Sequence, residues 1–240
     1  MTKQQIVLLR RAFFDSIPVL MGYLAMGFAA GVLLTATAGL QHPVLWAGSF
    51  AALCISGTLQ FAVVDWIRTA SPLLQVAFLT VCINMRYSMY GLSLLTRFQN
   101  IPRWQKWYLI GALTDETYAL EVGCRLPGKQ NILYCLLLSA MNHAYWIIGV
   151  TAGAMAGAAL PFSNKGIDFA MTALFIVILT DQCRKRENRI PALIGGGAAF
   201  CSLLIFGAAK MLIPTIGLIV LLFFTLRKSL DPQQKEANRG

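Results

Sequence analysis

Charged side chains are scarce in this chain of 240 residues. Asp, Glu, Lys and Arg together make up 12% of it, whereas hydrophobic residues make up 57%. A soluble domain carries about 25% charged residues, roughly twice that share. The apolar residues also fall in blocks of about 20, the length that crosses a hydrocarbon core of about 30 Å. These observations argue against a large soluble helical protein and predict a membrane protein with several spans.

The signatures of enzymes and of cofactor sites are also missing. The only histidines are His42 and His143, and neither an HExxH nor a GxSxG motif occurs. The GxxxxGK[ST] loop that binds nucleotide phosphates is absent too. The six cysteines show no CxxC or Cys/His spacing, which gives no support to a zinc site or a disulfide framework. We therefore expect a protein that is not an enzyme and that holds no metal or cofactor.

The net charge of +10 comes largely from short basic clusters between apolar blocks, at 10–11, 184–189 and 227–228. Such clusters orient membrane proteins through the cytoplasmic excess of Lys and Arg. They favour a cytoplasmic amino terminus, although the basic residues at 97–106 oppose that orientation. No basic stripe with interleaved aromatic residues occurs, so nucleic acid is not an expected partner. The amino-terminal segment lacks a cleavage site, and no removed signal peptide is expected.

The apolar blocks predict an all-α transmembrane bundle of about eight spans, within a range of six to eight. The predicted spans are 14–38, 44–67, 72–96, 104–123, 132–160, 168–183, 190–209 and 211–227. Residues 1–228 would form one integral membrane domain, followed by a polar, disordered tail at 229–240. The run Ser56, Gly57 and Thr58 would allow the second span to unwind, so a broken helix is expected there. No alignment between the two halves indicates an internal repeat.

Arg86 lies inside an apolar block, in TVCINMRYSMYGLSLLT. Charges at the centre of a bilayer are costly and usually pair with another group. Arg86 lies about 14 residues before the loop near Asn100, and Asp115 and Glu116 lie about 15 residues after it. At 1.5 Å per residue all three reach a depth of roughly 21 Å. An ion pair of Arg86 with Asp115 or Glu116 is therefore predicted, either as an internal staple or as part of a binding site.

Further polar residues fall at a similar depth. Ser56 and Asn84 lie equally far from the loop that joins their spans, and Gln60 lies one turn beyond Ser56. Asn142 and His143 lie about ten residues into the fifth span, where the histidine either packs in a hydrogen bond or carries a proton. One cation, two acids and several amides suit a zwitterionic solute. This pattern allows an amino acid substrate without establishing one.

Glycines also recur at helical spacing in two of the predicted spans. Gly149, Gly153 and Gly157 lie on one face of the fifth span, and Gly22, Gly27 and Gly31 lie in the first. Small residues on one face allow two helix backbones to approach closely. These faces predict tight helix packing, with a second subunit as the alternative partner of the fifth span.

Five stretches carry a resemblance to a known family. In order they are RAFFDSIPVLMGYLAMGFAAG, SGTLQF, INMRYSMYGLSL, LTDETYAL and GIDFAMTALFIVILTDQ. Their order and spacing resemble the AzlC-type family, the large subunit of bacterial branched-chain amino acid exporters (the LIV-E family). Thr58 departs from the alanine that family members more often carry at that point. Thr114, Asp168, Asp181 and Gln182 also fall within matching segments.

The resemblance implies a multi-pass permease of the bacterial cytoplasmic (inner) membrane. It would export leucine, isoleucine or valine together with a small AzlD-type membrane subunit. Proton antiport is the expected driving mechanism because no nucleotide-binding motif is present. A non-transporting scaffold or an ion-conducting subunit is the alternative.

The matching motifs and the polar positions together predict the site residues of such a transporter. Substrate binding is expected at Ser56, Gly57, Thr58, Gln60, Phe61, Asn84, Arg86 and Tyr90. Proton coupling is expected at Asp115, Glu116 or His143, with Arg86 as the counter-charge or as a ligand of the substrate carboxylate.

Overall fold

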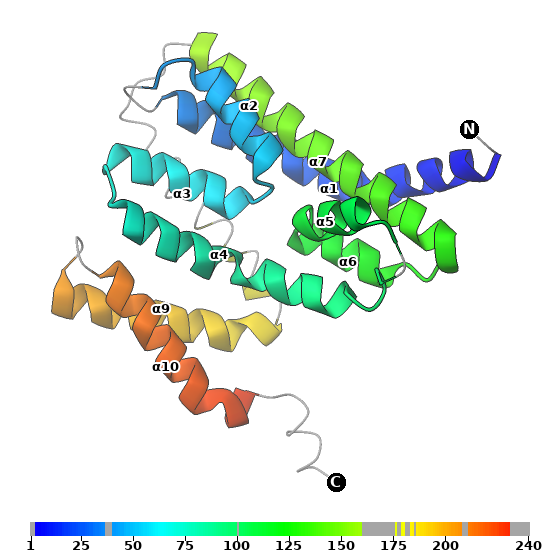
Figure 1. Cartoon of the computed structure of the whole chain (residues 1–240). Helices are drawn as coiled ribbons and strands as arrows, with labels where there is room; N and C mark the ends of the chain where they lie inside the picture. The colour runs from blue at the N-terminus through cyan, green and yellow to red at the C-terminus, as the bar shows by residue number, and fades with distance from the viewer. Residues whose placement is uncertain are drawn as a thin grey trace. The chain divides into compact units, whose positions relative to one another are not determined.

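The structure, a computed structural model, consists of helices and connecting loops, with no strand among the residues that it describes (Figure 1). Those residues are 3–36, 40–99, 101–159, 176, 179–180, 183–184, 186–207 and 211–230. The predicted all-α class is confirmed. The chain divides into two compact units, Met1–Asp168 and Phe169–Gly240. The single domain over 1–228 stays a prediction.

Two long helices form the frame of the first unit: α1 (Lys3–Thr35) and α7 (Gly128–Ala159). Both are long and apolar enough to cross a membrane, as is the stretch Arg189–Phe206 in the second unit. The two helices run parallel, because Gly27 faces Val150 and Gly31 faces Gly153. Their glycines bring the two backbones into contact, so the predicted close helix packing is confirmed within the chain itself.

The predicted second span, 44–67, consists of two helices, α2 (Pro43–Leu53) and α3 (Gly57–Arg68). The expected break is therefore present, at 54–56. At 1.5 Å per residue each helix is about 16–18 Å long, half the thickness of a hydrocarbon core. We call the pair, with its break, the first hairpin.

Contacts with α7 show that the first hairpin turns back on itself. The helix α2 runs antiparallel to α7, since Gly48 lies beside Thr151 while the Ala52 carbonyl meets His143. After the break, Gly57 packs against Trp146, and α3 returns toward the end from which α2 came. The hairpin therefore enters from the carboxyl-terminal end of α7 and reaches its middle.

The predicted span at 104–123 is helical but is interrupted by a break that was not predicted. This segment contains two helices, α5 (Arg103–Gly111) and α6 (Asp115–Gly123), joined at 112–114. The backbone of Thr114 is extended, with φ −122° and ψ 175°, and its side chain caps the new helix. Hydrogen bonding to the cap replaces the helical bonds that are lost at the break. We call this pair, with its break, the second hairpin.

The second hairpin enters from the opposite end of the unit. Helix α4 (Leu73–Leu94) runs antiparallel to α3, to which it is joined by a short turn. It runs parallel to α6, because Arg86 contacts Asp115 and Ser93 contacts Tyr118. The order of long helix then hairpin therefore occurs twice, as α1 with the first hairpin and as α4 with the second, in opposite directions (Figure 1). This inverted repeat was not predicted.

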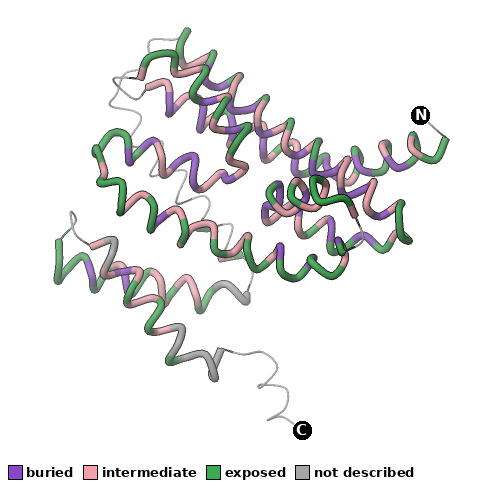
Figure 2. Tube along the Cα trace, viewed as in Figure 1, coloured by how far each residue is buried: buried purple, intermediate pink, exposed green. Residues whose placement is uncertain are grey.

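The core of the first unit lies along α1 and α7 and beneath the second hairpin. Buried residues follow the α1–α7 contact over most of its length (Figure 2). Around the second hairpin one apolar cluster contains Leu8, Ala12, Leu94, Phe98, Leu109, Leu113, Cys124, Tyr134, Cys135 and Leu138. This packing holds the second hairpin against both long helices.

The second unit contains α9 (Arg186–Phe206) and α10 (Leu212–Leu230). Gly207 follows α9 with φ 71°, and its N–H donates to the Leu203 carbonyl at 3.0 Å. A left-handed residue at this place ends a helix at little cost when it is glycine. The two helices are thus a second, separate helical pair.

The glycine contact between α1 and α7 gives a stability prediction. A Cβ at Gly153 would overlap the carbonyl oxygen of Phe28, so that one helix would have to move. We expect Gly153→Ala to lower the free energy of unfolding by about 1–3 kcal/mol, as overpacking does in other cores. Thermal unfolding of the detergent-purified protein measures this loss.

Gly22→Ala is the matched control, because a Cβ there meets no atom within 4 Å. Its midpoint of unfolding should equal or slightly exceed that of the wild type, because alanine favours the helix over glycine. A Gly153→Ala protein that unfolds together with the control would contradict the close α1–α7 contact.

Candidate functional site

The tip of the first hairpin is organised by Ser56. This residue has extended backbone, with φ −143° and ψ 102°, and its Oγ accepts the Leu59 N–H at 3.4 Å. The same hydroxyl donates to Oδ1 of Asn84 on α4 at 3.1 Å. Ser56 therefore begins α3 as its N-cap and fixes the amino terminus of α3 against α4.

Thr114 has the same role at the tip of the second hairpin. Its Oγ1 accepts the Thr117 N–H at 3.2 Å and lies 2.5 Å from the hydroxyl of Tyr23 on α1. The Tyr23 hydroxyl also donates to Oε2 of Glu116 at 2.9 Å. Both hairpin tips are thus capped helix amino termini, each held by a side chain from a neighbouring long helix.

Arg86 bonds to the first turn of both α3 and α6. Its Nη1 donates to Oδ2 of Asp115 at 2.6 Å, and its Nη2 donates to Oγ1 of Thr58 at 3.2 Å. The guanidinium also lies over the ring of Tyr87, 4.9 Å from the ring centroid. The predicted ion pair is present with Asp115, whereas Glu116 bonds to Tyr23. One guanidinium therefore joins the two hairpin tips.

The ion pair is not sealed inside the first unit. About a third of each side chain is exposed, 37% for Arg86 and 32% for Asp115. A helix amino terminus carries a partial positive charge and free N–H groups, which attract anions. Two such termini, a guanidinium and two nearby acids can therefore hold both the carboxylate and the ammonium group of a zwitterion.

Several buried polar atoms near the tips have no hydrogen-bond partner among the described residues. They are Nε2 of Gln60, Nε of Arg86, Oδ1 of Asp115 and Oδ1 of Asn142. Buried polar atoms are rarely left without a partner, so each such atom needs an explanation. Donors and acceptors occur together here, which is the combination that a bound polar solute would satisfy.

The remaining substrate residues predicted from the sequence lie in different surroundings. Gln60 is buried and accepts the indole N–H of Trp146 at 3.0 Å. Phe61 is 1% exposed and belongs to the packed interior. Tyr90 stacks on Tyr118 with ring centroids 4.3 Å apart and lies within interaction distance of the Asp115 carboxylate. The structure therefore brings Ser56, Gly57, Thr58, Asn84, Arg86 and Tyr90 together at the tips, with Gln60 one turn away.

His143 lies on another side of the tips. Its Nε2 is 3.1 Å from the Ala52 carbonyl at the end of α2, and its Nδ1 is 3.5 Å from the Tyr108 hydroxyl on α5. Among the described residues, no hydrogen bond joins it to Arg86 or to Asp115. Asp168, Asp181 and Gln182 lie outside the described residues.

Four residues of this region were not predicted from the sequence: Tyr87, Thr117, Glu121 and Trp146. Thr117 accepts the Nδ2 group of Asn142 at 3.0 Å, and both residues are buried. Glu121 is 0% exposed and accepts the Ser139 hydroxyl at 2.8 Å. An acid inside the predicted span 104–123 is a signal that could have identified Glu121, because intramembrane acids are rarely without function.

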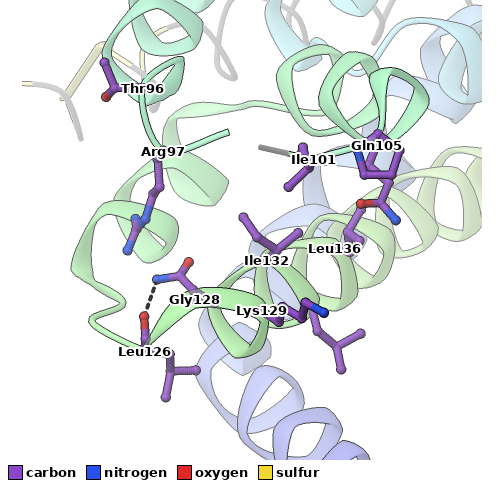
Figure 3. Close-up of a pocket in the computed structure, with 12 residues that line it drawn as sticks. Thr96, Arg97, Ile101, Gln105, Leu126, Gly128, Lys129, Ile132 and Leu136 are labelled. Carbon is purple, nitrogen blue, oxygen red and sulfur yellow. Dashed lines mark hydrogen bonds between the residues drawn. The ribbon is translucent and has the colours of Figure 1, made fainter. Parts of the chain in front are cut away.

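A pocket of the first unit lies away from the hairpin tips. It has a volume of about 770 Å³ and lies between the segment after α4 and the first turns of α7 (Figure 3). Arg97 and Asn131 are part of its wall, and Asn131 Nδ2 donates to the Leu126 carbonyl at 3.0 Å. The pocket therefore reaches the outer end of the second hairpin, behind the tips.

Comparison with known proteins decides the family. The family model described as AzlC protein matches residues 18–160, which contain both hairpins and all of α7. The chain belongs to the AzlC family. The AzlC match thus covers every residue of the two tips, and membership makes the chain a component of membrane transport rather than an enzyme.

Individual relatives agree with the AzlC assignment over most of the chain. A Bacillus subtilis protein named "Branched-chain amino acid transport protein AzlC" is 30% identical over 92% of this chain and 86% of its own length. A membrane protein of Helicobacter pylori strain J99 is 34% identical over 92% and 95%. The Escherichia coli inner membrane protein YgaZ is 27% identical over 72% and 73%. No solved structure matches the chain.

Variants of Thr114, the N-cap of α6, separate the contribution of its hydroxyl group to stability from that of its side-chain size. Thr114→Ala removes the acceptor of the Thr117 N–H and the partner of Tyr23. We expect it to cost about 1–2 kcal/mol of stability, the upper range for a lost N-cap. Thr114→Ser keeps the hydroxyl and should lose less than half as much. If both variants unfold at the same temperature, the hydroxyl is not what stabilises this tip.

Proposed function

We propose that this chain is the large permease subunit of an exporter of branched-chain amino acids. It moves leucine, isoleucine, valine or close analogues out of the cell as a proton-coupled secondary transporter. It works with a small AzlD-type membrane subunit in the bacterial cytoplasmic membrane, with its amino terminus in the cytoplasm. The alternative is a scaffold or ion-conducting subunit in which the polar centre only holds helices together.

The observation that carries the proposal is the polar centre where the two hairpin tips meet. Arg86 contacts the first turns of both α3 and α6 within a helical bundle of the AzlC family. Interrupted helices whose amino termini meet near mid-membrane are typical of the binding sites of secondary transporters. The Bacillus subtilis relative is named a branched-chain amino acid transport protein, which supports the substrate class.

In this proposal the carboxylate of the substrate binds at the tips. Ser56, Gly57 and Thr58 supply free N–H groups and hydroxyls at the start of α3, and Arg86 supplies positive charge. Asn84 and Gln60 complete the polar wall. Tyr90 lies beside Asp115 and, with Phe61, is proposed to shape the apolar part of the site, which receives the branched side chain. Phe61 is 1% exposed and would have to move to take this role.

Proton coupling in this proposal uses the acids at the start of α6. Asp115 is paired with Arg86, so a substrate carboxylate that binds Arg86 competes with Asp115 and favours its protonation. Glu116 is hydrogen-bonded to Tyr23 and can exchange a proton with the hydroxyls around Thr114. His143 is the third candidate, acting beside α2 and α5. A proton gradient is the proposed energy source because the sequence carries no phosphate-binding loop.

The test is uptake into inverted membrane vesicles that contain this chain, with and without a candidate small partner. Labelled leucine is followed with and without an acidic lumen. We expect at least tenfold accumulation only when both the partner and the gradient are present. If neither leucine nor valine moves with both subunits in the membrane, the substrate assignment is wrong.

Three variants separate the transporter from the scaffold: Arg86→Gln, Asp115→Asn and the double variant. Each single change leaves one charge of the pair without its partner, which lowers stability and protein level. The double change removes both charges and should restore the protein level. We expect at least a tenfold loss of transport in all three. If the double variant transports as well as the wild type, the ion pair of Arg86 and Asp115 only holds helices together.

A further inference from the structure

Glu121 is a buried acid that the proposed site does not use. It lies in the last turn of α6 and is 0% exposed. Its Oε1 accepts the Ser139 hydroxyl at 2.8 Å, whereas its Oε2 is buried with no hydrogen-bond partner among the described residues. An ionised carboxylate with one neutral hydrogen bond is very costly in apolar surroundings.

The charged and titratable groups around Glu121 do not offset this cost by forming an ion pair with its carboxylate. Arg97, from the segment after α4, donates to the backbone carbonyls of Glu121 and Cys124 and not to the carboxylate. From α7, Ser139 faces the carboxyl group together with the thiol of Cys135, whose hydrogen bond goes to Asn131. The described part of the chain gives Glu121 no ion pair. The least costly way to neutralise this carboxylate is to bind a proton.

A row of buried hydroxyl and amide groups leads from Glu121 toward the hairpin tips. Ser139 and Asn142 lie three residues apart on one face of α7, and Thr117 lies one turn before Glu121 on α6. Asn142 Nδ2 donates to Oγ1 of Thr117 at 3.0 Å, and the Thr114 hydroxyl bonds to the same oxygen at 3.0 Å. One helical turn of about 5.4 Å separates Glu121 from Thr117, a gap that one water molecule can bridge.

The row ends at the acids of the proposed site. Thr114 lies 2.5 Å from the Tyr23 hydroxyl, which donates to Glu116 at 2.9 Å. Hydroxyl groups both donate and accept, so they can pass a proton along such a row. The row of contacts therefore runs from Asn142 and Thr117 to Glu116, and one bridging water between Glu121 and Thr117 would complete the connection.

The other side of Glu121 is close to the pocket of about 770 Å³. Arg97 forms part of the pocket wall and binds the Glu121 carbonyl at 2.5 Å. Asn131, also in the wall, accepts the thiol of Cys135 at 3.3 Å. Figure 3 shows Arg97 beside Leu126 at the end of the second hairpin. Arg97 and Asn131 of the pocket wall therefore contact the backbone of Glu121 and the thiol that faces its carboxyl group.

We propose that Glu121 is a proton-binding site, placed between the pocket and the row of hydroxyls that leads to the hairpin tips. A proton from water in the pocket adds to Oε2, and the same proton leaves along the hydroxyl row when substrate binding changes the tips. The assignment rests on the proposed proton-coupled transport. Glu121 is thereby a fourth candidate for proton binding, besides Asp115, Glu116 and His143, which are expected from the sequence.

The transport test compares Glu121→Gln with Asp65→Asn in the same vesicles. Gln keeps the acceptor for Ser139 but cannot titrate, and Asp65 is an exposed acid on α3 that serves as the matched control. We expect Glu121→Gln to lose gradient-driven leucine accumulation at least tenfold. Exchange of labelled for unlabelled leucine, which needs no net proton movement, should stay within about twofold of wild type.

Two outcomes overturn the assignment while the proposed function stands. Wild-type accumulation by Glu121→Gln shows that no coupling proton resides there, and equal loss of accumulation and exchange by a folded variant shows a structural role. If leucine accumulation by the wild type does not depend on the proton gradient while leucine exchange continues, the proposed proton coupling is wrong. The proposed Glu121 site is then wrong as well. The two kinds of failure are therefore distinguishable.

Infrared difference spectroscopy on the purified protein tests the proton directly, without transport. We expect a band of a protonated, buried carboxyl group at neutral pH in the wild type that is absent in Glu121→Gln. Ser139→Ala, which removes the hydrogen bond to Oε1, should shift that band and leave it in place. This variant keeps the test available if Glu121→Gln fails to fold. A wild type with no such band, or a band that Ser139→Ala leaves unshifted, overturns the assignment.

Discussion

The first unit depends on one constraint, that backbone N–H groups in apolar surroundings must have partners. Each hairpin interrupts a helix and frees the N–H groups of a new amino terminus. Ser56 and Thr114 satisfy part of that need as N-caps, and Asn84 and Tyr23 hold the caps in place. The remaining N–H groups create the positive potential that makes the tips suited to an anion. Stability and the candidate site thus come from the same groups.

The long helices and the hairpins contribute different things to this arrangement. The α1–α7 pair is joined backbone to backbone through Gly27, Gly31 and Gly153, which leaves few side chains to rearrange. The hairpin tips are joined to the rest by Arg86 and by hydroxyl groups, which can change partners at small cost. Conformational change during transport is therefore expected in the hairpins, with α1 and α7 as the fixed frame.

Depth along a helix could be predicted from the sequence, whereas direction around it could not. Counting residues from the loop placed Arg86 level with Asp115, and the ion pair is present. The same counting placed His143 with them, but this residue faces α2 and α5 instead. The break at Ser56 was visible because Ser, Gly and Thr adjoin. The break at Thr114 was missed because Asp115 and Glu116 were interpreted only as partners of Arg86, although a threonine followed by acidic residues is typical of the start of a helix. The inverted repeat stayed hidden because apolar residues replace one another freely in helices that face lipid or each other.

The opposed entry of the two hairpins has a consequence for chemical inhibition. A compound that reaches the protein from one side of the membrane meets the outer end of one hairpin first, and a compound from the other side meets the outer end of the other. The two outer ends differ in chemistry, because α5 begins with Arg103, Trp104 and Lys106 in its first turn, whereas α2 begins at Pro43 with His42 as its N-cap. Molecules with the same effect on transport would therefore need two different structures, one for each side.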